Sequence, residues 1–446
     1  MSATRLAVLG GDPLVPAGVD ESGWPDVEQA DIDAVTSTLR SGLLSWFNNT
    51  EVRALEERWA SYVGVEHCLA LNSGTAALHA AVAAVGVGPG DEVIVPALSF
   101  LASASCVLHH QAIPIFADID PKTFTLDPAE LERVVTPSTK AIIVVHLHGL
   151  PADLEPILAF ADRHGLAVIE DAAQAHGATY HGRPVGSIGR IGAFSIMAGK
   201  NLATAGEGGL LTTDDAELRN RADAVKMFGE AIGPDHQREY NAHTIGYNYR
   251  FSPVLAAMAS SQLSRLDRYT KEVQAGAERL TARLAELPGV LPPVVPEGRT
   301  HVYHHFRITL DPVAAGLDLH PGVYRQAVQD ALSAEGIPVS GYQNRPLPGQ
   351  TLFQQLSGYG KGCPWTCGHA RPGIRYQPAD FSRTLAVIQR TLLVGSRLCM
   401  ASLRDPASVQ AYADAFTKVI SNREELLGYA RTIDYVEPWE TTSRLW

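Results

Sequence analysis

The chain has 446 residues, of which 36 are basic and 48 acidic, giving a formal net charge of -12 and a pI near 5.7. A hydrophobic fraction of 46% and a charged fraction of 19% are typical of a soluble globular protein with two or three domains. The acidic balance argues against nucleic acid or an anionic membrane as a partner, and no long apolar run predicts a signal peptide or membrane span, so we expect a cytoplasmic protein.

Between about residues 60 and 215, short aliphatic runs alternate with longer helical patterns, which predicts parallel strands joined by crossover helices. The predicted strands are Glu92–Pro96, Ile113–Ala117, Ala141–Leu147, Leu166–Glu170 and Gly208–Thr213. The predicted helices are Thr75–Val85, Ser99–His109, Asp127–Val135 and Pro151–His164. Because the strands are aliphatic at nearly every position, we expect an α/β domain whose sheet is covered on both faces.

From Pro253 the pattern changes to long amphipathic helices and then to a proline-rich segment at residues 288–296. The predicted elements here are helices at Val254–Leu266, Lys271–Leu287 and Pro321–Glu335, a strand at Tyr303–Leu310, a loop from Tyr342 to about Tyr376, and two closing helices. We therefore expect an N-terminal segment (residues 1–40), a large domain (41–265) and a smaller C-terminal α/β domain (266–446).

Ser73, Gly74 and Thr75 open an alanine-rich predicted helix. Backbone N–H groups at a helix start favour an anion such as phosphate. One helix end contributes only about 0.3–2 kcal/mol, so the Ser73 and Thr75 hydroxyls would have to add to the binding. Ordinary helix capping explains the same residues, and both interpretations stay open on this segment alone.

Asp171 follows an aliphatic run and so stands at the carboxyl end of a predicted parallel strand, where open α/β sheets bind ligands. Its carboxylate either caps the next helix or pairs with the nitrogen of a pyridine ring, which it would keep protonated. Gln174 lies one turn further on and would reach the same ligand.

Lys200 stands among small and apolar residues, following Phe194-Ser195-Ile196-Met197-Ala198-Gly199. Burial favours a neutral amine, which forms a Schiff base with an aldehyde, although a lysine that only reaches solvent fits the same segment. The spacing of the glycines before Lys200 excludes a P-loop. Gly86-Val87-Gly88-Pro89-Gly90 precedes a strand, which argues against a nicotinamide-dependent dehydrogenase.

Cysteine and histidine side chains are the commonest ligands of zinc in proteins. The cysteines are Cys68, Cys106, Cys363, Cys367 and Cys399, an odd and scattered set that predicts free thiols. Cys363 and Cys367 stand near His369, but a structural zinc site needs a fourth ligand. His146 with His148, and His301 with His304 and His305, are expected to serve in polar packing or substrate contact, so no metal is predicted.

Taken in chain order, the motifs form a recognisable set. They are Ser73-Gly74-Thr75, Phe100, Asp171-Ala172-Ala173-Gln174, Ser195 with Lys200 five residues later, and Gly246-Tyr247-Asn248-Tyr249-Arg250. Together they closely resemble the DegT/StrS family of sugar and cyclitol aminotransferases that depend on pyridoxal 5'-phosphate (PLP), from about Trp24 to beyond Leu266. The resemblance implies the PLP-dependent transferase fold type I, with a mixed, mainly parallel sheet in the large domain, and a homodimer whose subunits share active sites.

The resemblance also implies a role for each residue. Lys200 would bind PLP as a Schiff base, and Asp171 would pair with the pyridine nitrogen. Gln174 would contact the phenolic oxygen and Phe100 would stack on the ring. The turn Ser73-Gly74-Thr75 and Ser195 would hold the phosphate. Asn248 or Arg250 would reach the phosphate in the neighbouring subunit, and the resemblance does not decide between them.

By this resemblance, the enzyme moves an amino group from glutamate or glutamine to a ketone. Thr204–Gly209 and Cys363-Pro364-Trp365 are similar to the branch acting on keto-cyclitols, which favours a small polyhydroxylated ketone. Gly199–Leu202 and Gly246–Arg250 are similar to the branch acting on nucleotide-linked keto sugars, which stays an alternative. A PLP-dependent dehydratase would use the same site, but such relatives replace the lysine with histidine.

Overall fold

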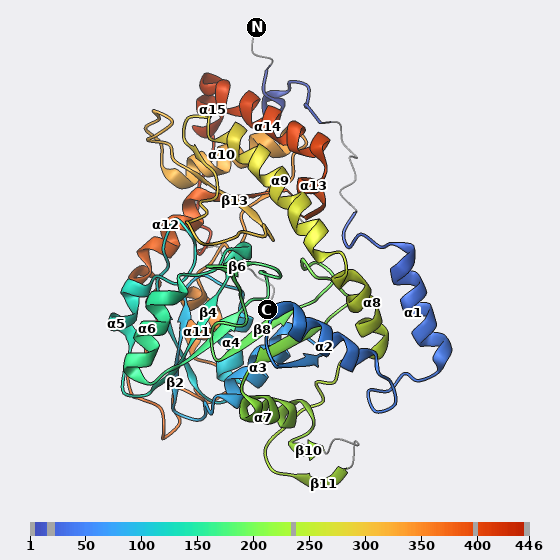
Figure 1. The fold of residues 1–446 in the computed structure, drawn as a ribbon. Helices are drawn as coiled ribbons and strands as arrows, with labels where there is room; N and C mark the ends of the chain where they lie inside the picture. The colour runs from blue at the N-terminus through green and yellow to red at the C-terminus, as the bar shows by residue number, and fades with distance from the viewer. Residues whose placement is uncertain (1–4, 16–22, 233–237, 396–399, 441–446) are drawn as a thin grey trace.

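The structure, a computed structural model, describes residues 5–15, 23–232, 238–395 and 400–440, so Cys399 lies outside the described residues. Among these residues, two sheets have more than two strands, and helices pack around each of them (Figure 1). None of the helices in these ranges is long and apolar enough to cross a membrane.

The larger sheet has seven strands in the order β1-β9-β8-β5-β4-β2-β3. Its strands are β1 (His67–Leu71), β2 (Glu92–Pro96), β3 (Ile113–Ala117), β4 (Thr139–Val145), β5 (Ala167–Asp171), β8 (Ile191–Ser195) and β9 (Gly209–Thr213). The pairs from β8 through β3 are parallel, and β9 runs antiparallel to both β1 and β8. The predicted mixed, mainly parallel sheet is confirmed, although β1 and β8 were not among the predicted strands.

Helices cover both faces of this sheet (Figure 1). They include α2 (Glu51–Val63), α3 (Gly74–Ala84), α4 (Ala102–Leu108), α5 (Leu131–Val134), α6 (Leu154–His164) and α7 (Ala216–Lys226). The predicted start of a helix at Ser99 was wrong, since α4 begins at Ala102 and Ser99 and Phe100 line a cavity instead. The predicted helix at Asp127 is a 3-10 turn, Pro128–Glu130, followed by the single turn of α5.

Two short hairpins leave the larger sheet. They are β6 (Thr179–Tyr180) with β7 (Arg183–Pro184), and β10 (Glu230–Ile232) with β11 (Arg238–Ala242). The second hairpin projects from the end of the molecule opposite the smaller sheet (Figure 1).

The smaller sheet is antiparallel, in the order β12-β13-β15-β14. Its strands are β12 (Val290–Leu291), β13 (Phe306–Leu310), β14 (Val339–Ser340) and β15 (Thr391–Val394). The helices of this half are α9 (Leu266–Leu284), α10 (Pro321–Ala334), α12 (Ser382–Arg390), α13 (Met400–Arg404), α14 (Pro406–Ser421) and α15 (Arg423–Ala430). The strand predicted from Tyr303 begins only at Phe306, because Tyr303 has a positive φ of 47°.

Two further expectations for this half were wrong. The segment after Tyr376 contains strand β15 and more than two helices. The predicted loop from Tyr342 includes the helix α11 (Thr351–Gln355). The two helices predicted after Pro253 are confirmed as α8 (Pro253–Leu263) and α9, with the break between them at Ser264 and Arg265.

Apolar contacts cross between distant parts of the chain. Phe353, Trp365 and Tyr376 pack into the core of the larger sheet, although they follow three strands of the smaller sheet in the chain. Leu6 packs into the core of the smaller sheet. The division at residues 40 and 265 stays a prediction.

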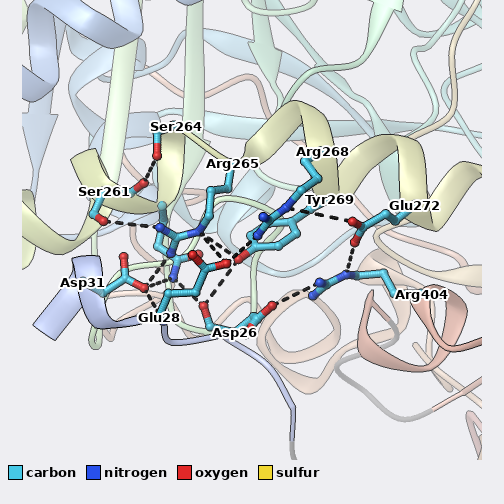
Figure 2. A network of polar contacts seen from close by, with 11 residues as sticks. Asp26, Glu28, Asp31, Ser261, Ser264, Arg265, Arg268, Tyr269, Glu272 and Arg404 are labelled. Atoms are coloured by element: carbon cyan, nitrogen blue, oxygen red, sulfur yellow. Dashed lines mark hydrogen bonds and ion pairs between the residues drawn. The ribbon is translucent and has the colours of Figure 1, made fainter.

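A polar network fixes the N-terminal segment to α8 and α9 (Figure 2). Asp31, on α1 (Gln29–Ser41), is 1% exposed and accepts hydrogen bonds from Arg265 at 2.5 Å and Gln262 at 2.9 Å. Arg404 bridges Asp26, at 3.0 Å, and Glu272, at 2.7 Å. Separating Asp31 from Arg265 would leave a buried charge uncompensated, which is costly. The contacts of Asp31 and Asp26 therefore hold the adjoining segment, which contains Trp24, in place.

Candidate active site

A cavity of about 450 Å³ lies where the carboxyl ends of β4, β5 and β8 meet the N-terminus of α3. It is lined by Gly74, Thr75, Leu78, Ser99, Phe100, Ala102, Val145, Asp171, Ala173, Gln174, Ser195, Met197, Gly199, Lys200, Glu207, His304, His305 and Tyr342. Seven predicted site residues are thus brought together around one space. Ser73, Asn248 and Arg250 do not line it.

A larger cavity of about 590 Å³ lies between α2 and α7 and contains none of the predicted residues. Its buried cation, Lys226, forms ion pairs with Asp223 at 2.8 Å and Glu56 at 3.8 Å. Those carboxylates outweigh burial and raise the pKa of Lys226, so its amine stays charged. A charged amine is a poor nucleophile, and we place the chemistry in the smaller cavity.

The N-terminus of α3 forms one wall of the active-site cavity. Ser73 caps the helix, its Oγ accepting a hydrogen bond from the Ala76 N–H at 3.1 Å. The N–H groups of Gly74 and Thr75 precede the first intrahelical bond, which Ala77 donates to the Ser73 carbonyl, so they are available to an anion. A Cβ on Gly74 would lie 2.6 Å from the Cβ of Ser195, so only glycine lets α3 approach β8 this closely.

Asp171 ends β5 and is buried. Its Oδ2 accepts a hydrogen bond from the Ser103 hydroxyl at 2.7 Å, and its Oδ1 accepts one from the Ala173 N–H at 3.2 Å. Ser103 lies 2.7 Å from the hydroxyl of Ser99, which lines the cavity. Burial raises the pKa of Asp171, although the hydrogen bond from Ser103 lowers it in part. A cation that faced this carboxylate would lower its pKa further and stabilise the ionised form.

The neighbouring Glu170 points to the other side of β5 and anchors the strand. It accepts hydrogen bonds from His146 Nε2 at 2.9 Å and from the N–H groups of Gly186, Ile188 and Gly189 at 2.6–2.8 Å. Burial would raise the pKa of Glu170, but these donors hold it below its ordinary value. A fully bonded carboxylate here fixes the strand end that presents Asp171.

Lys200 reaches the cavity from a turn after β8. Its N–H donates to the Met197 carbonyl at 2.8 Å, and its own carbonyl accepts a hydrogen bond from Trp24 Nε1 at 3.0 Å. Burial lowers the pKa of Lys200 to about 8, while the carboxylates of Asp171 and Glu207 act in the opposite direction. A substantial fraction of the amine is therefore neutral near pH 8 and able to attack a carbonyl carbon.

Gln174 is buried and lines the cavity next to Asp171. Its Oε1 accepts a hydrogen bond from the His148 N–H at 2.7 Å. Phe100 also lines the cavity, with 61% of its surface exposed. An aromatic ring this exposed at a cavity mouth is available for stacking on a bound ring.

Asn248 and Arg250 do not line the cavity of their own chain, although Arg250 forms a β-bridge with Leu71, just before the turn at the start of α3. Arg250 stacks on the rings of Phe228 at 5.0 Å and Phe47 at 5.7 Å. The Asn248 carbonyl accepts a hydrogen bond from the Asn72 side chain at 3.3 Å. Their predicted role in a neighbouring subunit stays a prediction.

The histidines and cysteines that the sequence singled out as possible metal ligands make polar contacts with neighbouring side chains. His304 and His305 line the cavity, and His304 Nδ1 lies 2.9 Å from the Asn201 side chain. The sulfurs of Cys363 and Cys367 lie 2.8 Å apart. In the described ranges, no three or more histidine, cysteine or acidic side chains are grouped to hold a metal ion.

Sequence reasoning missed several residues of the site. Ser99 and Ser103 stand four residues apart in a predicted helix, a spacing that indicates one face, but nothing nearby in sequence connected them to Asp171. Glu207, Met197 and Tyr342 carried no signal as lining residues. Tyr342 comes from the far half of the chain, so only the folded structure brings it to the cavity.

Comparisons with known proteins agree with this geometry. The sequence model of the DegT/DnrJ/EryC1/StrS aminotransferase family matches residues 25–371. An L-glutamine:2-deoxy-scyllo-inosose aminotransferase from Streptomyces paromomycinus is 40% identical over 443 residues, covering 95% of this chain and 99% of the relative. A GDP-perosamine synthase from Caulobacter vibrioides is 45% identical over 259 residues, covering 57% of this chain and 68% of the relative.

Solved structures give the same result for the fold. The crystal structure of 3-amino-5-hydroxybenzoic acid synthase has a TM-score of 0.77 and 28% identity, and the match covers 91% of this chain and 100% of that one. The predicted fold type I is confirmed by this similarity together with the mixed sheet. The chain belongs to the DegT/DnrJ/EryC1/StrS aminotransferase family.

Proposed function

We propose that this enzyme binds PLP at Lys200 and transfers an amino group from glutamine or glutamate to a keto-cyclitol. The observation that carries the proposal is the cavity in which the Lys200 amine, with a pKa lowered by burial to about 8, shares one space with Asp171 and Gln174. Similarity over 95% of the chain to an L-glutamine:2-deoxy-scyllo-inosose aminotransferase supports the donor and acceptor classes.

The residues present fit PLP. A phosphate would meet the N–H groups of Gly74 and Thr75 at the start of α3, beside Ser195. The Asp171 carboxylate would face the pyridine nitrogen, and the exposed Phe100 ring would stack on the pyridine. When bound, PLP supplies an electron sink that lets nitrogen leave one carbon and join another.

The protein supplies attachment, orientation and proton transfer. Lys200 Nζ would hold the cofactor, and once free its neutral amine would take the proton from the donor carbon that loses nitrogen and later supply one to the acceptor carbon. The hydrogen bonds from Ser103 and Ala173 hold the Asp171 carboxylate in place, where it would pair with the ring nitrogen.

A homodimer with shared sites is part of the proposal. Apolar side chains are exposed on two neighbouring segments, with Leu43 and Leu44 before α2, and Phe228, Tyr240 and Ile245 around the hairpin of β10 and β11. A second copy would cover these side chains and the exposed ring of Phe100. The free thiols of Cys68 and Cys106 fit the reducing cytoplasm as the compartment.

A nucleotide-linked keto sugar is the second candidate acceptor. It is favoured by the 45% identity to a GDP-perosamine synthase, although that similarity covers 57% of this chain. A nucleotide-linked sugar is larger than a keto-cyclitol and carries phosphates. Comparing the rates of amino transfer to the two acceptors therefore distinguishes the two candidate functions.

The experiment uses the purified protein with PLP. Visible absorbance of lysine-bound PLP is expected, and borohydride reduction should attach the cofactor to the peptide that contains Lys200. The protein is then loaded with the amino group from L-glutamine and exposed to keto-cyclitols or to nucleotide-linked keto sugars. Faster recovery of the absorbance with keto-cyclitols supports the proposal. Absence of a labelled Lys200 peptide contradicts it, and product that lacks nitrogen would indicate a dehydratase.

A further inference from the structure

His148 has a backbone conformation that is unusual for a residue with a side chain. It lies after β4 in the 3-10 turn Leu147–Gly149, with φ 62° and ψ 4°. A left-handed conformation costs a non-glycine residue about 1–2 kcal/mol. The next residue, Gly149, also has a positive φ of 97°, and a Cβ there would lie 2.8 Å from the Val302 side chain. The surrounding structure therefore imposes this turn on His148.

The turn directs the His148 N–H to the side chain of Gln174. That N–H donates to Gln174 Oε1 at 2.7 Å, and both residues are buried. Because the amide oxygen of Gln174 is used in this way, its NH₂ group is the part left to face the cavity. The phenolic oxygen of PLP, when ionised, only accepts hydrogen bonds. The backbone of His148 thus selects the amide orientation that donates to such an oxygen.

The side chain of His148 is held by Arg307 on β13. Arg307 Nη1 donates to His148 Nε2 at 3.0 Å, and Arg307 Nε donates to the Thr391 hydroxyl on β15 at 2.8 Å. Burial keeps the pKa of His148 well below its ordinary value, so the ring is neutral and Nε2 accepts. Burial also lowers the pKa of Arg307, to about 9, which leaves the guanidinium charged at pH 7.

Arg307 differs from the buried Arg265, which pairs with Asp31 at 2.5 Å, and is similar to Arg325, which donates to the neutral amide of Gln329 at 2.8 Å. Among the described residues no carboxylate forms an ion pair with Arg307, whose guanidinium lies over the Phe124 ring at 5.0 Å. A buried cation without a counter-charge is costly, so its hydrogen bond to His148 is a large part of what satisfies it.

We infer that Arg307 and His148 are positioning residues that fix the side-chain amide of Gln174 as a hydrogen-bond donor toward the phenolic oxygen of PLP. The contact links the smaller sheet, through β13 and β15, to the wall of the active site. The inference rests on the proposed binding of PLP at Lys200.

The test measures the pH midpoint of the visible absorbance and the PLP dissociation constant for Arg307→Met, Gln174→Ala and the double variant. Arg307→Met should shift the midpoint in the same direction as Gln174→Ala and weaken PLP binding about tenfold, the loss expected for a hydrogen bond to a charged group. The double variant should match Gln174→Ala, because both changes remove one interaction. Additive shifts, or no shift in Arg307→Met, overturn the inference.

Two controls protect the test against a general loss of structure. Arg325→Met removes a second buried guanidinium, which acts on Arg307 through its charge but has no hydrogen bond to His148, and it should leave the midpoint unchanged. His148→Gly keeps the N–H and tolerates the positive φ, whereas His148→Ala resists it. His148→Gly should therefore bind PLP more tightly than His148→Ala, and equal binding counts against the role of the backbone. A wild-type protein without lysine-bound PLP would contradict the proposed function itself.

Discussion

The hydroxyl of Ser103 lies 2.7 Å from Oδ2 of Asp171 and donates a hydrogen bond to it. The two residues come from α4 and β5 and are 68 positions apart in the sequence. This bond, with that from Ala173, opposes the effect of burial on the carboxylate. A serine that does not line the cavity therefore limits how far burial raises the pKa of Asp171.

Ser103→Ala should raise the pKa of Asp171 further, because only the ionised carboxylate gains from the donated bond. On acidification, the variant should therefore lose activity at a higher pH than the wild type. Its kcat should also fall about 10- to 100-fold, the loss expected for one hydrogen bond to a charged group. The pH profile of kcat measures this. Ser105→Ala, on the same helix, is the control and should retain the wild-type profile. An unchanged profile in Ser103→Ala would remove Ser103 from the mechanism.

The depressed pKa of Lys200 gives a second prediction. PLP capture by the ligand-free protein should accelerate with pH through about 8, because only the neutral amine attacks the aldehyde. Stopped-flow absorbance measures the rate. Lys226, whose amine stays charged in its ion pairs, should not be labelled by borohydride. A rate that rises only near pH 10.5, the ordinary value, would contradict the burial effect.

The same group affects stability. Between about pH 8 and 10.5 the unfolded chain holds a proton on Lys200 that the folded chain has released. Stability therefore increases with pH across this window relative to Lys200→Met, which cannot titrate. Chemical denaturation of both ligand-free proteins at several pH values measures the difference.

The network around Asp31 predicts a large effect on stability. Asp31→Ala should lower the free energy of unfolding by about 3–5 kcal/mol, because the buried Arg265 guanidinium then loses its closest carboxylate and keeps only the more exposed Glu28 at 3.6 Å. Hydrogen exchange should increase in α1 and around Trp24, whose indole N–H holds the Lys200 carbonyl. Asp33→Ala, an exposed position on the same helix, should change stability by less than about 0.5 kcal/mol. Equal effects of the two substitutions would mean that the network contributes little.

The proposed dimer predicts that Ile245→Asp weakens self-association. Ile245 is 79% exposed, and a charge there would be buried without a partner in the proposed interface. The dissociation constant of the dimer should rise at least about tenfold, with a parallel loss of activity. Sedimentation measures the change. Val313→Asp, at an equally exposed position in the other half, should remain dimeric. A dimeric, fully active Ile245→Asp protein would place the interface elsewhere.

The sequence by itself determined the parallel strands β2, β3, β4 and β5 and the small motifs near the strand ends. Aliphatic runs and the Ser73-Gly74-Thr75 cap depend on neighbours within a few residues, so their patterns are readable without the fold. The same holds for Asp171 at the end of its strand, and the family resemblance then connected these motifs to Lys200.

Only the tertiary structure decided what surrounds those residues. The strand order brings Ser103 to Asp171, and the meeting of the two sheets brings Arg307 to His148 across 159 positions. Contacts of this kind depend on packing between distant elements and leave no local pattern in the chain. For the same reason β15 and the late start of β13 at Phe306 were missed, since antiparallel pairing and a positive φ at Tyr303 set them rather than local composition.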